Sequence, residues 1–286
     1  MRPDVSAFLH AASNTWSYIA SDPATHAAAI IDPVLDFDAA SGRIASTSAQ
    51  ALLDHAAAQR LEVRWLLETH AHADHLSAGH WLKARLPGAR LAIGARIREV
   101  QAYFRPLFNA DFAIDGSQFD HLFEEDEAFV VGALPARVLA VPGHTPDSVA
   151  YVIGDALFTG DSLFLPDGGS ARCDFPGGDP ALLYRSIRRL FERLPDETRV
   201  FVCHDYGPGG RALSHETTIG AQKRENIHVR DGNDEAAFVA MRSARDGTLP
   251  VPALLLPALQ VNLRGGGLPE AEDNGVRYLK IPLDRL

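Results

Sequence analysis

The sequence predicts an αβ protein with layered sheets, because strand-like and helix-like segments alternate along most of its 286 residues. Short apolar runs that end in turn residues recur along the chain, and such runs are typical of buried strands. Stretches with helical periodicity lie between these runs, and two further helices are expected in the last third of the chain.

The expected elements follow one another without a long interruption. The expected strands are residues 28–31, 63–67, 138–141 and 149–153. The expected helices are residues 48–60 with Ser48 as cap, 76–86 closed by Pro87-Gly88, 180–194 opened by Asp179, 214–227 and 233–245. No repeat or Gly/Ser linker divides the chain, which favours one domain over residues 1–286.

Two segments depart from this alternation. Residues 103–127 are rich in phenylalanine and then in acidic residues, and residues 249–268 are rich in Pro, Leu and Gly. We interpret the first as a packed aromatic and acidic insertion, and the second as part of a C-terminal extension over about residues 229–286. A lid or a contact between subunits is the alternative interpretation.

The composition restricts the class of partner. A formal net charge of −10 argues against nucleic acid or an anionic membrane surface as the main partner. The N-terminus resembles no secretory signal and no run approaches the roughly 18 apolar residues of a membrane helix, so a cytoplasmic protein is expected. Only Cys173 and Cys203 are present, which excludes a four-thiolate zinc site. Any metal must therefore use histidines and carboxylates.

The run His70-Ala71-His72-Ala73-Asp74-His75 has the spacing of metal ligands. In an extended chain residues i and i+2 point the same way, so His70 and His72 can face one metal. Asp74 and His75 then fall at the start of the helix expected at 76–86, which can direct them to a second position. This run predicts a metalloenzyme.

Three further candidates follow strand-like runs elsewhere in the chain. They are His144, Asp161 and His204, and His70 also follows such a run. In αβ sheets ligands collect beyond the carboxyl ends of strands, so four such ends can form one pocket. Alone, each of these residues would be interpreted as an ordinary loop residue, but together with the first run they are interpreted as ligands.

These motifs resemble those of the metallo-β-lactamase superfamily. The resemblance rests on the 69–75 run, on Pro142-Gly143-His144-Thr145-Pro146, on Phe158-Thr159-Gly160-Asp161 and on Cys203-His204-Asp205-Tyr206. It covers about residues 15–227 and implies an αββα sandwich, in which two mixed sheets lie back to back with helices outside. The site would then lie at one edge of the sheets.

Two groups of this superfamily, both acting on glutathione derivatives, fit the ligand inventory. The resemblance to glyoxalase II thioesterases implies two Zn(II) ions, with His70, His72 and His144 on the first, Asp74, His75 and His204 on the second, and Asp161 as a bridge. Zinc-bound hydroxide would then attack a thioester. All seven positions are filled.

The resemblance to persulfide dioxygenases implies one Fe(II) ion per chain, held by His70, His144 and Asp161. Two imidazoles and one carboxylate leave coordination positions open for a sulfur substrate and O2. In that case His72, Asp74, His75 and His204 would orient the ligands and carry protons.

The segment that follows Asp161 separates the two groups. Arg172-Cys173-Asp174-Phe175 is similar to the Arg-Thr-Asp-Phe loop of the dioxygenases, which the thioesterases lack, although Ala171 and Cys173 depart from the family pattern. Arg172 could bind a substrate carboxylate or persulfide, or form a salt bridge to Asp174. Tyr206 could hydrogen-bond the substrate or be a buried structural residue.

We therefore predict a glutathione persulfide dioxygenase that uses O2, with a dinuclear zinc hydrolase as the alternative and a sulfide-responsive binding protein as a third possibility. Arg172 and Tyr206 are its candidate substrate-binding and catalytic residues. Lys223 and Arg224 could bind glutathione, as basic residues of the terminal helices do in glyoxalase II. The resemblance also suggests a homodimer or a higher homo-oligomer.

Overall fold

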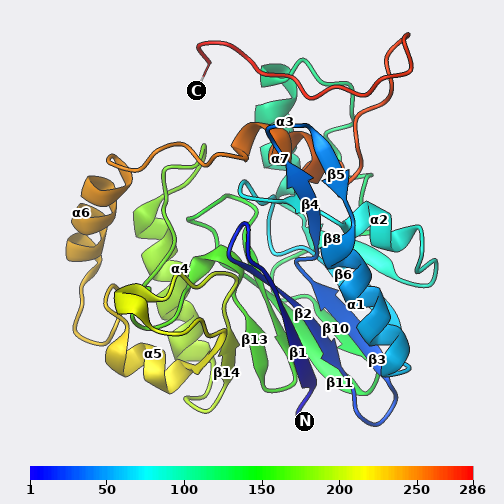
Figure 1. Cartoon of the computed structure of the whole chain (residues 1–286). Coiled ribbons are helices and arrows are strands. Elements are labelled where there is room, and N and C mark those ends of the chain that lie inside the picture. Colours follow the sequence, from blue (N-terminus) through cyan, green and yellow to red (C-terminus); the bar gives the residue numbers. More distant parts are fainter. Residues whose placement is uncertain (286) are drawn as a thin grey trace.

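Two mixed six-stranded sheets form the centre of the computed structural model, which describes residues 1–285 (Figure 1). The first sheet has the order β1 (Asp4–His10), β2 (Thr15–Ser21), β3 (Ala27–Ile31), β6 (Glu62–Leu67), β8 (Arg90–Gly94) and β9 (His121–Phe123). The second has the order β10 (Ala128–Val131), β11 (Leu134–Ala140), β12 (Val149–Ile153), β13 (Ala156–Phe158), β14 (Arg199–Phe201) and β15 (Glu216–Thr218).

Helices cover the outer face of each sheet. The helices on the side of the first sheet are α1 (Thr47–Ala58), α2 (Gly79–Lys83), α3 (Ile97–Leu107) and α7 (Leu255–Asn262). Those on the side of the second sheet are α4 (Pro180–Arg193), α5 (Ile219–Glu225) and α6 (Glu235–Asp246). A small sheet of β4 (Val34–Asp38), β5 (Arg43–Ala45) and β7 (Leu76–Ser77) lies beside the first. Short 3-10 turns occur at Gly160–Ser162 and Pro208–Gly210.

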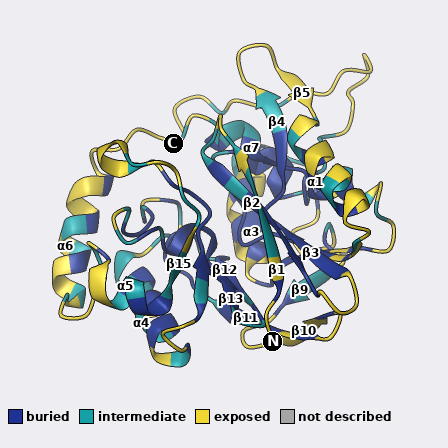
Figure 2. Cartoon of the chain, turned by 60° about the horizontal axis from the view of Figure 1, so that its bottom comes forward, coloured by how far each residue is buried: buried dark blue, intermediate teal, exposed yellow. Residues whose placement is uncertain are grey.

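The alternation of side chains along the strands builds this layered core. In β3, Ala28 and Ile30 pack toward the helices, whereas Ala29 and Ile31 pack between the two sheets. Both faces of the central strands are therefore buried, and exposed residues gather on the outer helices and loops (Figure 2). The αββα sandwich implied by the resemblance is confirmed.

Most predicted elements are present, and the helix expected at 76–86 is the clearest error. Leu76 and Ser77 pair with β4 as the strand β7, and the helix α2 begins only at Gly79. The side chain of Asn262 accepts the backbone N–H of Ser77 at 2.7 Å, which holds this segment extended. Asp74 and His75 therefore lie in a loop and not at a helix start.

Helix ends also differ from the expected ones. The helix expected at 48–60 begins at Thr47, and Ser48 does not cap it but donates its hydroxyl to Asp36 at 2.8 Å. Residues 216–218 form β15, so the helix expected at 214–227 starts at Ile219. Asp179 does cap α4, by accepting the N–H groups of Ala181 and Leu182.

The aromatic segment 103–127 contributes to the core beside the first sheet. Five of its phenylalanines are buried: Phe104, Phe108, Phe112, Phe119 and Phe123. In the extension that follows α5, helix α6 packs on α4, and α7 packs on β7. None of the helices within residues 1–285 is long and apolar enough to cross a lipid bilayer.

Candidate metal centre

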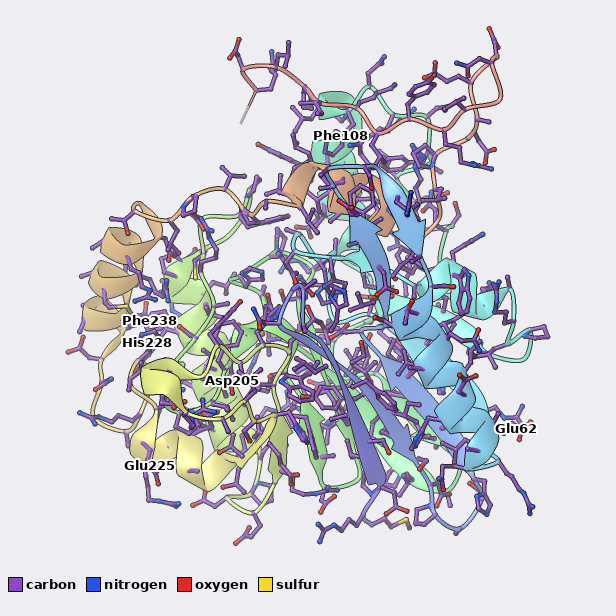
Figure 3. All side chains as sticks on the ribbon, in the orientation of Figure 1. Glu62, Phe108, Asp205, Glu225, His228 and Phe238 are labelled. Atoms are coloured by element: carbon purple, nitrogen blue, oxygen red, sulfur yellow. The ribbon has the colours of Figure 1, made fainter. Side chains whose placement is uncertain are left out.

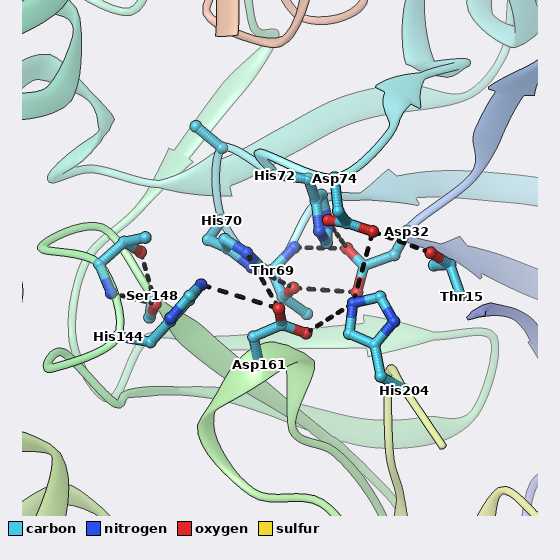
Figure 4. A network of polar contacts seen from close by, with 12 residues as sticks. Thr15, Asp32, Thr69, His70, His72, Asp74, His144, Ser148, Asp161 and His204 are labelled. Carbon is cyan, nitrogen blue, oxygen red and sulfur yellow. Dashed lines mark hydrogen bonds and ion pairs between the residues drawn. The ribbon is translucent and has the colours of Figure 1, made fainter. Parts of the chain in front are cut away.

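The candidate ligands lie where four strands end at one edge of the sandwich (Figure 4). His70 follows β6, His144 follows β11, His204 follows β14, and Asp161 lies in the 3-10 turn after β13. Gly160 brings that turn close to the His70 loop, because a Cβ atom at this position would lie 2.4 Å from the Thr69 hydroxyl. Its φ of +51° also favours glycine.

Two imidazoles and one carboxylate converge at the centre. The Asp161 Oδ2 atom lies 4.0 Å from His70 Nε2 and 3.7 Å from His144 Nε2. The ligand atoms of these three residues all lie within 4.8 Å of one another. Figure 4 shows Asp161 between His144 on one side and His204 on the other.

The protonation pattern of these imidazoles fits a metal ligand set. His144 donates its Nδ1–H to the carbonyl of Arg172 at 2.6 Å, which leaves the Nε2 lone pair directed at Asp161. His70 Nε2 is buried and has no hydrogen-bond partner among the described residues. A buried ring nitrogen without a partner beside a carboxylate is what a divalent metal would satisfy.

A second cluster lies beside this triad. His72, Asp74 and His75 also have ligand atoms within 4.8 Å of one another, with His75 Nδ1 3.1 Å from Asp74 Oδ2. His204 joins the two clusters, because its Nε2 atom lies 3.2 Å from Asp161 and 3.5 Å from Asp74. Within residues 1–285, His70, His72 and His144 do not form a group whose ligand atoms all lie within 4.8 Å of one another.

Burial and neighbouring charges shift the pKa values of His70, His204 and Asp161. Burial lowers the pKa of His70, and the neighbouring His72 lowers it further. Burial opposes protonation of His204, but Asp161 and Asp74 outweigh it and raise the pKa of His204 to about 10. Burial raises the pKa of Asp161, and His204 with the other imidazoles more than reverses that effect.

Asp32 is a further candidate residue of the site, which was not expected from the sequence. Its carboxylate accepts the N–H of Thr69 at 2.7 Å, the hydroxyl of Thr69 at 2.9 Å and the Nε2–H of His72 at 3.0 Å. It therefore holds the start of the ligand loop and fixes the ring of His72. The signal was available, because Asp32 directly follows the strand expected at 28–31, as His70 follows its own strand.

A cavity of about 630 Å³ opens beside the centre. Its walls include His144, Asp161, Arg172 and Tyr206, and the segment 249–253 contributes a further wall. This volume lies in the range typical of small-molecule sites. The cavity therefore gives a substrate access to the candidate ligands.

Arg172 and Tyr206 both lie in this cavity wall, with different surroundings. Arg172 forms a two-pronged ion pair with Asp174 at 2.5 Å and donates to the carbonyl of Pro250 at 2.8 Å. The salt bridge considered as its alternative role is thus formed. Tyr206 is 63% exposed and stacks on His204, with 6.0 Å between the ring centroids. Its side chain is not a buried structural one.

Three further residues considered in the sequence are Cys173, which is buried, and Lys223 and Arg224, which lie outside the cavity wall. Burial raises the pKa of Cys173 to about 12, which keeps the thiol protonated at neutral pH. Lys223 pairs with Asp196 at 2.6 Å, and Arg224 lies 3.8 Å from Glu225. Neither basic residue is part of the cavity wall formed by the described residues.

Comparison with known proteins gives a family and two kinds of relative. Residues 12–204 match the model of the metallo-beta-lactamase superfamily. A probable metallo-hydrolase of Burkholderia pseudomallei (strain 1710b) is 51% identical over 294 residues, covering 99% of both chains. Glyoxylase B2 of Dictyostelium discoideum is 45% identical over 285 residues, covering 99% of this chain and 97% of that protein.

Proteins of the persulfide dioxygenase kind are also similar. The mitochondrial persulfide dioxygenase ETHE1 of Bos taurus is 29% identical over 257 residues, covering 89% of this chain and 85% of that protein. The crystal structure of ETHE1 from Myxococcus xanthus superposes with a TM-score of 0.74 at 31% identity, covering 92% of this chain and all of that one.

Proposed function

This chain belongs to the metallo-β-lactamase superfamily, and from that premise we propose that it is a glutathione persulfide dioxygenase with one ferrous ion. The observation that carries the proposal is the convergence of His70, His144 and Asp161. Two imidazoles and one carboxylate form the ligand set of many non-heme Fe(II) oxygenases. Bound ferrous iron would supply the redox chemistry that lets O2 react with a sulfur anion.

The geometry of the remaining ligands supports one metal more than two. A thioesterase of the glyoxalase II kind would need His70, His72 and His144 together on its first metal. In the described chain His72 is grouped instead with Asp74 and His75, and with Asp32 and Glu68. Asp32 accepts a hydrogen bond from Nε2 of His72 at 3.0 Å, which fixes the orientation of this imidazole.

The Arg172 loop links the cavity to the ligands. The carbonyl of Arg172 accepts the Nδ1–H of His144, while its guanidinium binds Asp174 and the Pro250 carbonyl. Phe175 packs with its ring centroid 6.3 Å from that of His144. This loop therefore sets the orientation of one ligand and the position of one cavity wall. It supports the dioxygenase proposal because the thioesterases lack the Asp-Phe pair after the arginine.

The proposed reaction balances with water as the third reactant. Glutathione persulfide, O2 and water give glutathione, sulfite and two protons. The outer sulfur loses four electrons, which O2 takes up, and the bond between the two sulfurs breaks. His204, beside Asp161 and Asp74, is positioned to hold or transfer the released protons.

A dinuclear zinc hydrolase is the second candidate, and a specific observation favours it. Asp74, His75 and His204 lie beside Asp161, and relatives described as a metallo-hydrolase and a glyoxylase are 51% and 45% identical to this chain. In that case a metal-bound hydroxide would cleave a thioester without O2.

Two assays on protein purified without oxygen separate the candidates. We expect O2 uptake and sulfite release with glutathione persulfide, in equal amounts, and no more than background hydrolysis of S-lactoylglutathione. Thioester cleavage in the absence of O2, without sulfite release from the persulfide, would replace the proposal by the hydrolase.

A further inference from the structure

Three arginines line the cavity, and two of them have their charge compensated. Arg172 pairs with Asp174, and Arg242 pairs with Asp246 four residues later in α6. The second pair is almost completely buried. These two guanidinium groups therefore stabilise the fold through ion pairs within the protein. The third arginine is Arg245.

Arg245 presents a positive charge that forms no ion pair with an acid of residues 1–285. It is an exposed residue near the end of α6 that lines the same cavity as His144 and Asp161. Within residues 1–285 its guanidinium forms neither an ion pair nor a hydrogen bond, although the chain as a whole is strongly acidic. A fixed cation in a cavity attracts anions, and a guanidinium binds carboxylates in a two-pronged geometry.

His228 adds a hydrogen-bond donor to this part of the cavity. Its Nδ1 atom accepts the backbone N–H of Ser170 at 3.0 Å, so the proton of the neutral ring is on Nε2. Burial, helped by the charges of Arg242 and Arg245, lowers the pKa of His228 to about 4. The ring is therefore neutral at physiological pH. Its Nε2–H has no partner among the described residues.

The loop residue Gly169 leaves the space that the ring of His228 occupies. A Cβ atom on Gly169 would lie 2.1 Å from Nδ1 of His228, so only glycine allows the ring to pack there. Figure 3 shows His228 beside α6, the helix that carries Arg245. The donor and the cation thus come from two segments that the fold holds against one cavity.

We propose that Arg245 and the Nε2–H of His228 form an anion subsite that binds a carboxylate of the sulfur-bearing substrate. Two residues of the metal triad, His144 and Asp161, line the same cavity as this subsite, so one molecule can reach both. The subsite selects substrates that carry a carboxylate at a distance from the reacting sulfur. The identity of the substrate as a glutathione derivative rests on the proposed function, whereas the recognition of an anion does not.

The test replaces Arg245 by glutamine in the metal-loaded protein. Because a hydrogen-bonded charge pair is lost, we expect KM for glutathione persulfide to rise about tenfold or more, with kcat changed less than about twofold. The matched control is Arg230→Gln, since Arg230 is also exposed but is not part of the cavity wall. This control should leave both constants unchanged.

A substrate with both carboxylates esterified tests the chemistry of recognition. The diethyl ester of glutathione persulfide should have the same raised KM with the wild-type protein and with Arg245→Gln, because the variant has no carboxylate contact left to lose. Calorimetric titration of glutathione into the metal-loaded proteins gives a readout other than turnover. We expect Arg245→Gln to bind glutathione about tenfold more weakly than wild type and Arg230→Gln.

The outcomes separate the subsite from the proposed reaction. Equal KM and equal glutathione affinity for wild type and Arg245→Gln would overturn the subsite, even with full O2 uptake. If the wild-type protein cleaves S-lactoylglutathione instead, and Arg245→Gln raises KM for that thioester, the dioxygenase proposal fails while the subsite stands. If Arg245→Gln raised KM equally for the free and for the esterified substrate, this result would also contradict carboxylate recognition.

Discussion

Each histidine of the candidate centre has one ring nitrogen fixed by the surrounding protein. The Nδ1 atoms of His144 and His204 donate to the carbonyls of Arg172 and Asn14, and Nε2 of His72 donates to Asp32. The Nε2 atoms of His144 and His204 are thereby left to face Asp161. This pairing holds the imidazoles in place before any metal binds, which reduces the entropy lost on binding.

We therefore expect Asp32 to influence metal affinity although it is not in the triad. We expect Asp32→Asn to weaken metal binding about 10- to 100-fold, because the amide is a weaker acceptor for His72 and Thr69. Chelator competition measures this change. Asp38→Asn, at an exposed aspartate of β4, is the control and should bind metal as wild type does. An Asp32→Asn protein with wild-type affinity would show that His72 needs no such support.

The candidate ligands could be selected from the sequence, but which of them lie close together could not. The spacing of His70, His72, Asp74 and His75 predicts a metal site, because few other constraints place three histidines and an acid in six residues. Which of them converge depends on the path of the loop and on partners such as Asp32 and Asn262, which are distant in sequence. Arg245 was not predicted either, because its exposure to the cavity arises only when α6 packs on α4.

At the scale of elements, α6 is attached to the Arg172 loop by a buried ion pair. Arg242 donates to the carbonyl of Ser170 at 3.2 Å, and Asp246 accepts the N–H of Cys173 at 2.8 Å. The helix thus holds both ends of the segment that precedes Phe175. The expected helix 233–245 agrees closely with α6, yet its role as an anchor could not be predicted from periodicity.

Removal of one partner of this pair leaves the other charge buried. We expect Asp246→Ala to lower the free energy of unfolding by about 3–5 kcal/mol, measured by urea denaturation. Asp231→Ala removes an exposed partner of Arg188 and should change it by less than about 1 kcal/mol. Comparable effects of the two substitutions would contradict an anchoring role for α6.

The His228 contact makes the same region sensitive to acid. Its folded-state pKa of about 4 lies below the value of about 6.5 expected in the unfolded chain, so between these values the unfolded state binds more protons. Stability should therefore fall as the pH drops from about 6.5 toward about 4. His228→Gln, whose amide oxygen can accept from Ser170, should lose less Tm than wild type between about pH 7.5 and about pH 5. Equal losses in both proteins would refute this assignment.

At the scale of the whole molecule, alternating strands and helices were enough to predict the fold class. The αββα arrangement itself came from the resemblance, since the periodicity of single strands does not say how two sheets pair. The N-terminal strands β1 and β2 were not predicted, although they bring Thr15 to within 3.1 Å of Asp74. β1 is half-buried, and both strands mix polar with apolar residues, which gives a weak strand signal.

The central claim is that one metal binds at His70, His144 and Asp161, while His75 supports the site without holding a second ion. Metal analysis of anaerobically purified wild type, Asp161→Ala and His75→Gln tests it most directly. We expect about one iron per chain in wild type and in His75→Gln, and almost none in Asp161→Ala. Two metals per chain in wild type with one lost in His75→Gln, or full iron in Asp161→Ala, would contradict it.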